Sequence, residues 1–287
     1  MVQNIRTIKD IKSYMIRELI AIYPEPEINA LNTIIIKTLF GISRLHSLTQ
    51  PNDPVSRKKA DEIIRICNEL KKWKPLQYIL GETSFYNCVI NVNPDVMIPR
   101  TETEELVDLI IKENKGYSDA ILDVGCGSGC ISIALAVNLP GSKVTGIDIC
   151  KGAVKTSEEN AVLNDVNVTF LVADILNPSL KLPVSAGIIV SNPPYIMESE
   201  KANMAINVLD FEPQNALFVP DSDPLLFYKA IIKMSDTILL HGGKIYLEIN
   251  EAMGRHMTEL LNSSGFSSVA VIRDINGKNR IIKGLKI

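Results

Sequence analysis

The sequence predicts an α/β protein with a seven-stranded, doubly wound sheet whose last strand is antiparallel. Two observations support this fold. From residue 101 onward, apolar runs of strand length alternate with helical stretches, which is typical of a parallel sheet covered on both faces. The last two runs are joined only by "NGKN", which is too short for a parallel crossover. The expected strands are residues 120–125, 143–149, 168–174, 186–192, 243–249, 269–275 and 280–287.

Two smaller parts precede this sheet. Residues 1–74 are expected to form a helical bundle, because Ile8, Ile11, Met15 and Leu19 recur at helical spacing. A later helix of this bundle is expected to start at Pro54. Residues 75–100 are predicted to be a β-hairpin linker, since Gly81 interrupts the helical pattern and an alternating stretch follows. Residues 101–287 are expected to form the sheet domain.

The charge of the chain is unevenly distributed. The net charge is −3, but residues 1–80 carry 13 Lys and Arg against 8 Asp and Glu, whereas residues 81–287 carry 17 against 25. A net acidic chain argues against a protein that coats nucleic acid, and the imbalance indicates two functional units. The basic bundle is either a stability module or a docking surface for a macromolecule, and the residues alone leave both readings open.

The five cysteines are odd in number, and no signal-peptide core stands at the N-terminus. We therefore expect a reducing, cytoplasmic location. Cys126 and Cys130 lie in a glycine loop with no second pair or histidine nearby, so no metal site is expected. The most apolar early run, "LNTIIIKTLF", is too short to cross a bilayer.

A glycine-rich loop follows the first expected strand. In "ILDVGCGSGCISIALA", Gly125, Gly127 and Gly129 come after Asp123 and before an apolar helix. Glycines allow sharp turns and close approach of the backbone to a ligand, and the helix start offers free N–H groups. A dinucleotide fingerprint needs a third glycine three residues after the second, and Cys130 stands there instead. The spacing fits a nucleoside cofactor without a pyrophosphate.

Acidic residues end the next two expected strands. Asp148 stands nineteen residues after Gly129 and is suited to accept hydrogen bonds from both ribose hydroxyls. Asp174 ends the third strand and is placed to meet the amine of an adenine, with Ile175 packing on the ring. Either carboxylate alone would be an ordinary loop residue, but together with the glycine loop they predict a cofactor site.

The fourth strand ends in Asn192-Pro193-Pro194-Tyr195. A rigid turn would explain the prolines, but not Asn and Tyr at fixed places. A planar –NH2 group is a poor nucleophile, and two acceptors would position it and return electron density to its nitrogen. The Asn192 side-chain oxygen and the Pro193 carbonyl can be these acceptors, while Tyr195 can stack on the planar group. The turn therefore predicts catalysis by positioning and electrostatics.

These motifs together resemble the class I, Rossmann-like methyltransferases that use S-adenosylmethionine to methylate planar amino nitrogens. Further stretches narrow the resemblance to the peptide-chain release factor glutamine N5-methyltransferases. They are "PLQYILGETSFY", "IPRTETEELV", "EPQNALF" and "GFSSVAVIRDINGKNRII". The resemblance covers roughly residues 70–287, and the N-terminal bundle suits the same family.

The resemblance implies a function and a set of site residues. The methyl group of S-adenosylmethionine would go to the side-chain N5 of the glutamine in a Gly-Gly-Gln motif of release factors, leaving S-adenosylhomocysteine. Asn192 would touch cofactor and substrate, and Pro193, Pro194 and Tyr195 would complete a glutamine clamp. The cofactor contacts would be Gly125, Cys126, Gly127, Ser128, Gly129, Asp148, Asp174, Ile175 and Asn192.

Other family positions are less defined. Phe85 would line the pocket and Arg100, Thr101 and Glu102 would lie near the cofactor, or all four would belong to a linker packed on the catalytic domain. The chain departs from the usual pattern at Thr101, in "DPLLFY" (223–228) and at Asn250 and Glu251. We expect these departures to affect surface details and not the chemistry.

Three alternatives remain. A DNA adenine-N6 methyltransferase uses the same tetrapeptide on a flipped base, but it would need a basic DNA-facing surface, and residues 81–287 are net acidic. The second alternative is a methyltransferase that modifies glutamine in a ribosomal protein. Only the N-terminal bundle distinguishes it from a release factor methyltransferase, and only weakly. A non-catalytic binding module would have no use for two aimed acceptors. We expect a monomer that binds release factors, with no stable nucleic acid and no membrane partner.

Overall fold

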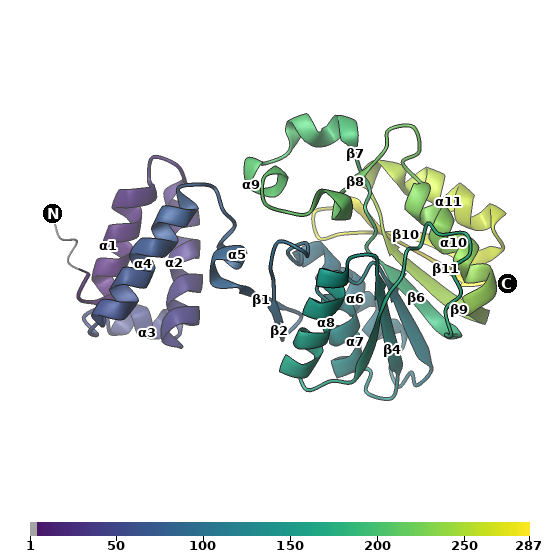
Figure 1. Ribbon diagram of the computed structural model, residues 1–287, viewed down its shortest axis with the longest axis horizontal. Coiled ribbons are helices and arrows are strands. Elements are labelled where there is room, and N and C mark those ends of the chain that lie inside the picture. The colour runs from purple at the N-terminus through teal and green to yellow at the C-terminus, as the bar shows by residue number, and fades with distance from the viewer. Residues whose placement is uncertain (1–4) are drawn as a thin grey trace. The chain divides into compact units, whose positions relative to one another are not determined.

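The computed structural model describes residues 5–287 (Figure 1). The chain divides into two compact units. The first contains the residues up to Leu80 together with 206–211, and the second contains residues 81–205 and 212–287.

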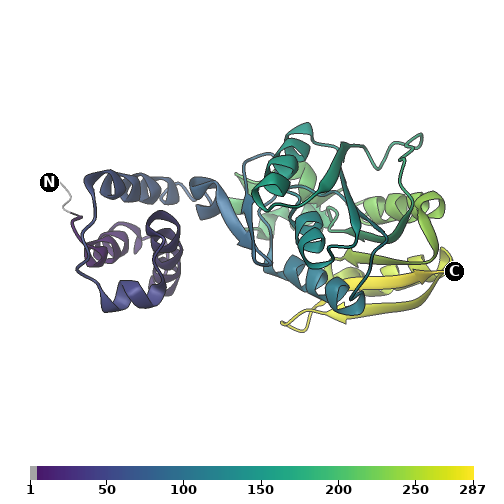
Figure 2. The same cartoon turned by 90° about the horizontal axis from the view of Figure 1, so that it is seen from below.

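The first unit is helical, and its apolar stripes face one another. Figures 1 and 2 show α1, α2 and α4 side by side. Ile11, Met15, Ile35 and Ile63 are fully buried between these helices, which is how short amphipathic helices become stable. The helices are α1 (Ile8–Leu19), α2 (Glu25–Phe40), α3 (Arg44–Thr49), α4 (Arg57–Leu70), α5 (Leu76–Leu80) and α9 (Ile206–Leu209).

One predicted helix start is wrong. Helix α4 begins at Arg57 and not at Pro54. Ser56 is its N-cap, since the Ser56 hydroxyl oxygen accepts the backbone N–H of Lys59 at 3.4 Å. Pro54 instead pairs with Thr7 in an isolated β-bridge. A serine side chain satisfies an orphan N–H at the first turn, which a proline ring cannot do.

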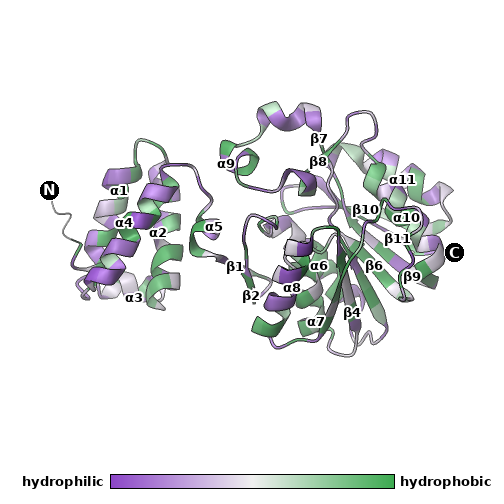
Figure 3. Ribbon diagram, viewed as in Figure 1, coloured by the Kyte–Doolittle hydropathy of each residue, from purple (hydrophilic) through white to green (hydrophobic). Residues whose placement is uncertain are grey.

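The second unit is built on a seven-stranded sheet, as predicted. Its strand order is β10-β11-β9-β6-β3-β4-β5. Hydrophobic residues dominate helix α7, which packs on the sheet (green in Figure 3). Helices α6, α7 and α8 cover one face, and α10 and α11 cover the other (Figure 1). The sheet elements are β3 (Ala120–Val124), β4 (Lys143–Asp148), β5 (Val168–Val172), β6 (Ala186–Ser191), β9 (Leu239–Glu248), β10 (Phe266–Arg273), β11 (Asn279–Lys286), α6 (Thr101–Glu113), α7 (Cys130–Asn138), α8 (Lys151–Leu163), α10 (Leu226–Ile238) and α11 (Gly254–Ser263).

The terminal strands follow the expected topology. β11 runs antiparallel to both β10 and β9, and the β10–β11 hairpin is the yellow ribbon at one edge of the sheet in Figure 2. Gly277 has a φ of 78°, a backbone conformation that glycine adopts without strain. Asp274 accepts the backbone N–H groups of Asn276 and Lys278 and so closes the turn.

Smaller elements complete this unit. The predicted hairpin is present, with Tyr86 and Asn87 at its turn. Within residues 5–287, no helix has the length and apolar character needed to span a membrane. The smaller elements are β1 (Glu82–Phe85), β2 (Cys88–Asn91), β7 (Ile196–Met197), β8 (Phe218–Val219), η1 (Glu198–Asn203), η2 (Gln214–Ala216) and η3 (Glu251–Met253).

Candidate functional site

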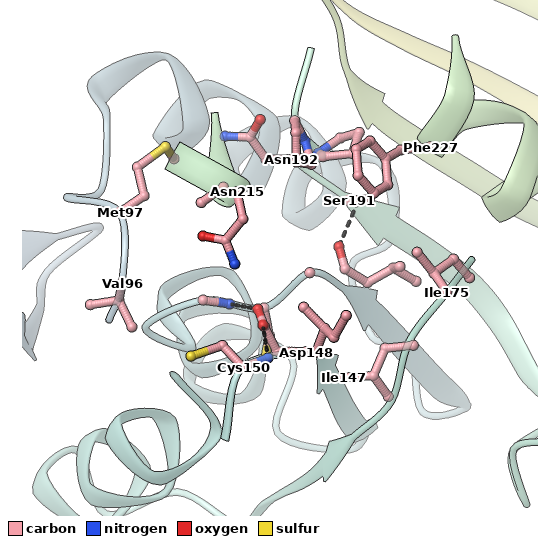
Figure 4. A pocket seen from close by; sticks show the side chains of 18 of the residues that line it. Val96, Met97, Ile147, Asp148, Cys150, Ile175, Ser191, Asn192, Asn215 and Phe227 are labelled. Carbon is pink, nitrogen blue, oxygen red and sulfur yellow. Dashed lines mark hydrogen bonds between the residues drawn. The ribbon is translucent and has the colours of Figure 1, made fainter. Parts of the chain in front are cut away.

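A cavity of 260 Å³ lies at the carboxyl ends of β3, β4 and β6, entirely within the second unit (Figure 4). Ligands of open α/β sheets bind at this edge, where the strand order reverses. The loops that follow the three strands form much of its wall, and residues from other segments, among them Val96, Met97, Asn215 and Phe227, form the rest. The motifs singled out in the sequence therefore converge on one cavity.

The glycine loop after β3 forms one side of this cavity. Gly125, Cys126, Gly127 and Ser128 line it, and the loop is tied to β4 because the Gly125 and Cys126 N–H groups both donate to the Ile147 carbonyl. Gly129 is not among the lining residues. It is the N-cap of α7 with a φ of 78°, and a Cβ there would meet Ser157 at 3.0 Å. Gly129 thus shapes the loop instead of facing the cavity.

Two carboxylates hold this loop in shape. Asp123 is fully buried and accepts hydrogen bonds from the Ser132 hydroxyl and backbone N–H, and burial raises its pKa to about 7. Asp148 lines the cavity, and its two oxygens accept the Gly127 and Cys150 N–H groups, each at 2.9 Å (Figure 4). Burial raises the Asp148 pKa, while these N–H groups oppose the rise. Each Asp148 oxygen keeps a lone pair for a ligand.

The loop after β5 supplies a mostly apolar wall. Asp174 and Ile175 both line the cavity, with Ile147 and Ile149 from the β4 end. One Asp174 oxygen accepts the Leu176 N–H at 2.8 Å, which closes the loop and holds the carboxylate in place. A mostly apolar wall with a few carboxylates is suited to a nucleoside.

The turn after β6 brings Asn192 to the cavity. Asn192 Nδ2 donates to the Thr103 hydroxyl oxygen at 3.0 Å. The amide nitrogen is therefore engaged with the protein, and the Asn192 Oδ1 stays available as an acceptor. Just before it, the Ser191 hydroxyl donates to the Val124 carbonyl at 2.6 Å and fixes the end of β6 against β3.

The three residues after Asn192 divide between two environments. Pro193 and Pro194 line the cavity, and the Pro193 carbonyl accepts no hydrogen bond within residues 5–287. Tyr195 is not among the lining residues. Its hydroxyl donates to Glu248 Oε1 at 3.0 Å, and its ring packs against the core of the sheet. The stacking role of Tyr195 stays a prediction, and in this structure the residue braces the turn from behind.

The linker residues expected near the cofactor lie apart from the cavity wall. Phe85 is 1% exposed and does not line the cavity, which agrees with the second of the two alternatives, a linker residue packed on the catalytic domain. The inward face of β1 carries it into the protein core. Arg100 pairs with the buried Glu212 at 2.5 Å, and Thr101 and Glu102 form the first turn of α6.

Two sequence departures reach the site, contrary to expectation. Phe227, from "DPLLFY", lines the cavity. Asn250 Nδ2 donates to the Tyr195 carbonyl at 3.4 Å and so touches the tetrapeptide turn. These positions are distant in sequence from the motifs, and only the packing of α10 and the β9 end against the turn brings them together.

Some site residues were not singled out from the sequence. Thr103 and Asn215 lie inside quoted family motifs, but nothing in those stretches marked the individual residues. Glu248 carried a signal that could have been used, because it is a carboxylate within the apolar run "KIYLEI". A charged side chain in a buried strand needs hydrogen-bonding or ionic partners. Such a group of polar side chains inside the protein indicates a polar site.

Comparison with known proteins agrees with this geometry. The family model described as "Methyltransferase small domain" matches residues 102–217, and the "PrmC N-terminal domain" model matches residues 13–81. A crystal structure of a methyltransferase from Pyrococcus furiosus shares the fold, with a TM-score of 0.51, 15% identity and coverage of 80% of this chain and 99% of that one. The matched family model gives the class of protein, a methyltransferase.

Curated relatives give the particular family. A release factor glutamine methyltransferase of Flavobacterium psychrophilum is 41% identical over 96% of this chain and 98% of its own length. One of Bacteroides thetaiotaomicron is 43% identical over 95% of this chain and 98% of its own. The chain belongs to the release factor glutamine methyltransferase family.

Proposed function

We propose that this protein transfers a methyl group from S-adenosylmethionine to the side-chain N5 of the glutamine in the Gly-Gly-Gln motif of peptide-chain release factors. The observation that carries the proposal is the turn after β6. Asn192 Oδ1 and the Pro193 carbonyl are both left as acceptors at a cavity that also holds the glycine loop and Asp148. Membership of the family supports the substrate.

The residues present fit the cofactor. The Asp148 oxygens keep lone pairs for the ribose hydroxyls, and Ile147, Ile149 and Ile175 offer apolar contact to an adenine. The backbone of Gly125 and Gly127 would approach the amino acid part, and Asp174 the exocyclic amine. When bound, S-adenosylmethionine supplies an electrophilic methyl group on a sulfonium centre.

The protein contributes positioning of the glutamine. Asn192 Oδ1 accepts one N–H of the substrate carboxamide and the Pro193 carbonyl accepts the other. Two acceptors restrict the rotation of the group and shift electron density toward its nitrogen. No strong general base is required, since the proton leaves as or after the methyl group arrives. Tyr195, braced on Glu248, keeps the turn in the geometry that aims both acceptors.

A labelling experiment tests the substrate. Enzyme and radiolabelled S-adenosylmethionine are incubated separately with a release factor, a ribosomal protein and duplex DNA. We expect label only in the release factor, on the N5 atom of the Gly-Gly-Gln glutamine, as located by mass spectrometry of its peptides. Label in the ribosomal protein or in adenine would assign the protein to one of those substrates instead.

We also propose that the N-terminal bundle docks the release factor. The basic excess of residues 1–80 supports this role. Deletion of residues 1–72 is expected to raise KM for an intact release factor at least tenfold and to change the Kd for S-adenosylmethionine less than threefold, because the cavity lies wholly in the second unit. Normal kinetics of the truncated enzyme on the intact factor would assign the bundle to stability alone.

A further inference from the structure

A buried chain of hydrogen bonds runs from the proposed clamp into the sheet. Asn192 Nδ2 donates to Thr103 Oγ1 at 3.0 Å, and the Thr103 hydroxyl donates to Glu248 Oε2 at 2.8 Å. The other Glu248 oxygen, Oε1, accepts the Tyr195 hydroxyl at 3.0 Å. One carboxylate on β9 therefore holds both ends of the Asn192–Tyr195 turn.

We propose that Thr103 and Glu248 are positioning residues that decide which end of the Asn192 side chain faces the substrate. The inference rests on the proposed function and adds the residues that orient the Asn192 amide within the glutamine clamp. Neither residue needs to touch the reacting atoms, because each acts through Asn192.

The direction of the hydrogen bonds carries this inference. An ionised carboxylate only accepts, so Glu248 takes the single proton of the Thr103 hydroxyl. The Thr103 oxygen can then only accept from Asn192, and the part of Asn192 that can donate is its –NH2. Oδ1 must then point away from Thr103, which leaves it for the substrate. With a donor in place of the carboxylate, Thr103 could donate to Asn192 instead, and the amide would turn its –NH2 outward.

The surroundings make this arrangement unambiguous. Thr103 and Glu248 are 2% and 1% exposed, so no bulk water competes for their hydrogen bonds. An –NH2 group facing the substrate would meet another –NH2 group, and two donors cannot pair. A reversed Asn192 is thus unproductive, and it also repels the correct substrate.

The groups that face Glu248 shift its pKa in opposite directions, and the net shift is upward. Burial raises its pKa, whereas the Thr103 and Tyr195 hydroxyls and the positive charge of Arg280 on β11 lower it, and Glu102 on α6 raises it further. The Tyr228 hydroxyl of α10 donates to the Glu248 backbone carbonyl and not to the carboxylate. As the pH falls through this raised pKa, Glu248 becomes protonated. The carboxyl group can then donate as well as accept, so it no longer fixes the direction of the Thr103 hydrogen bond.

Thr103 can be tested with a matched control. Thr103→Val keeps the shape but removes the hydroxyl, and we expect kcat to fall ten- to a hundredfold with the Kd for S-adenosylmethionine changed less than threefold. Thr103→Ser is expected to restore kcat to within about threefold. The control is Thr156→Val: Thr156 is 3% exposed and accepts a hydrogen bond from Asn93 Nδ2 at 2.8 Å outside the cavity wall. It should leave kcat within about twofold.

Glu248→Gln tests the direction of the hydrogen bonds. The amide is isosteric but brings a donor, so we expect a similar loss of kcat at saturating cofactor. In the wild type, we expect kcat to fall at low pH in part because Glu248 becomes protonated. In Glu248→Gln, this part of the fall should be absent. Asp123 and Asp148, whose pKa values are also raised, are present in both proteins, so the difference between the two profiles isolates Glu248. Identical profiles, or a Thr103→Val enzyme with wild-type kcat, would overturn the inference.

A readout independent of turnover separates this inference from the proposed function. The side-chain –NH2 signals of Asn192, identified by their loss in Asn192→Asp, are followed by NMR in the full-length protein. We expect them to titrate with Glu248 in the wild type and not in Glu248→Gln. Titration in a protein that methylates no glutamine would refute the function and keep the network. Asn192 signals that do not change with pH in an active wild-type enzyme would refute the network and keep the function. This test requires no kinetics from a weakly folded variant.

Discussion

Asn192→Ala is expected to lower kcat for release factor methylation by about two to three orders of magnitude, the loss typical of removing one preorganised hydrogen-bond partner of the reacting group. The protein should still fold. In the described part of the chain the Asn192 side chain makes one hydrogen bond, to Thr103, and losing such a bond costs about 1 kcal/mol of unfolding free energy. Single-turnover methylation and thermal melting measure the two effects.

Asn138→Ala is the matched control for this variant. Asn138 ends helix α7 in the same unit, and its side chain donates to the Ala134 carbonyl at 2.8 Å, away from the cavity wall. We expect wild-type kcat from it. If Asn192→Ala methylated the glutamine as fast as this control, the clamp as drawn from Asn192 and Pro193 would have to be abandoned.

Asp148→Asn is expected to weaken S-adenosylmethionine binding by about ten- to a hundredfold. Two effects combine. Charge-assisted hydrogen bonds to the ribose, worth about 1.5–3 kcal/mol, are lost. Both Asp148 oxygens also accept backbone N–H groups, from Gly127 and Cys150, so an asparagine –NH2 must face one of these donors and disturb the loop. Calorimetric titration with S-adenosylmethionine and S-adenosylhomocysteine measures the change.

The control for Asp148→Asn is Asp119→Asn, an exposed carboxylate of the same unit outside the cavity wall. It should bind the cofactor like the wild type. Equal affinity of the two variants would mean that Asp148 only shapes the loop, and the ribose would then need another partner.

The predicted sheet and its terminal hairpin are confirmed. Both could be predicted because the sequence patterns that indicate them are local. Apolar runs mark β3, β4 and β6, and a short "NGKN" connection permits only an antiparallel partner. The start of α4 was placed wrongly for a related reason. Pro54 and Ser56 are both ordinary signals for a helix start, and the β-bridge of Pro54 to Thr7, a contact distant in sequence, decides between them.

The site also has some features that local sequence predicts and others that depend on contacts distant in sequence. The glycine loop, Asp148, Asp174 and the residues from Asn192 to Pro194 each end or follow a strand. The parallel direction of these strands therefore predicts that they share one edge of the sheet. Phe85 and Tyr195 also stand in motifs, yet their side chains pack toward the core, because the direction of a side chain depends on what packs against its backbone. Gly129 shapes the loop instead of lining the cavity. Conversely, Phe227 and Asn250 reach the site through packing alone.

By itself, the sequence determined the sheet, its order of elements and the identity of the groups that can hold a nucleoside and a carboxamide, since these depend on periodicity and on residue type. Only the tertiary structure decided how the Asn192 amide is oriented. That orientation depends on the proton of one threonine hydroxyl and on a carboxylate 145 residues further along the chain, and only folding brings these groups within hydrogen-bond distance of each other.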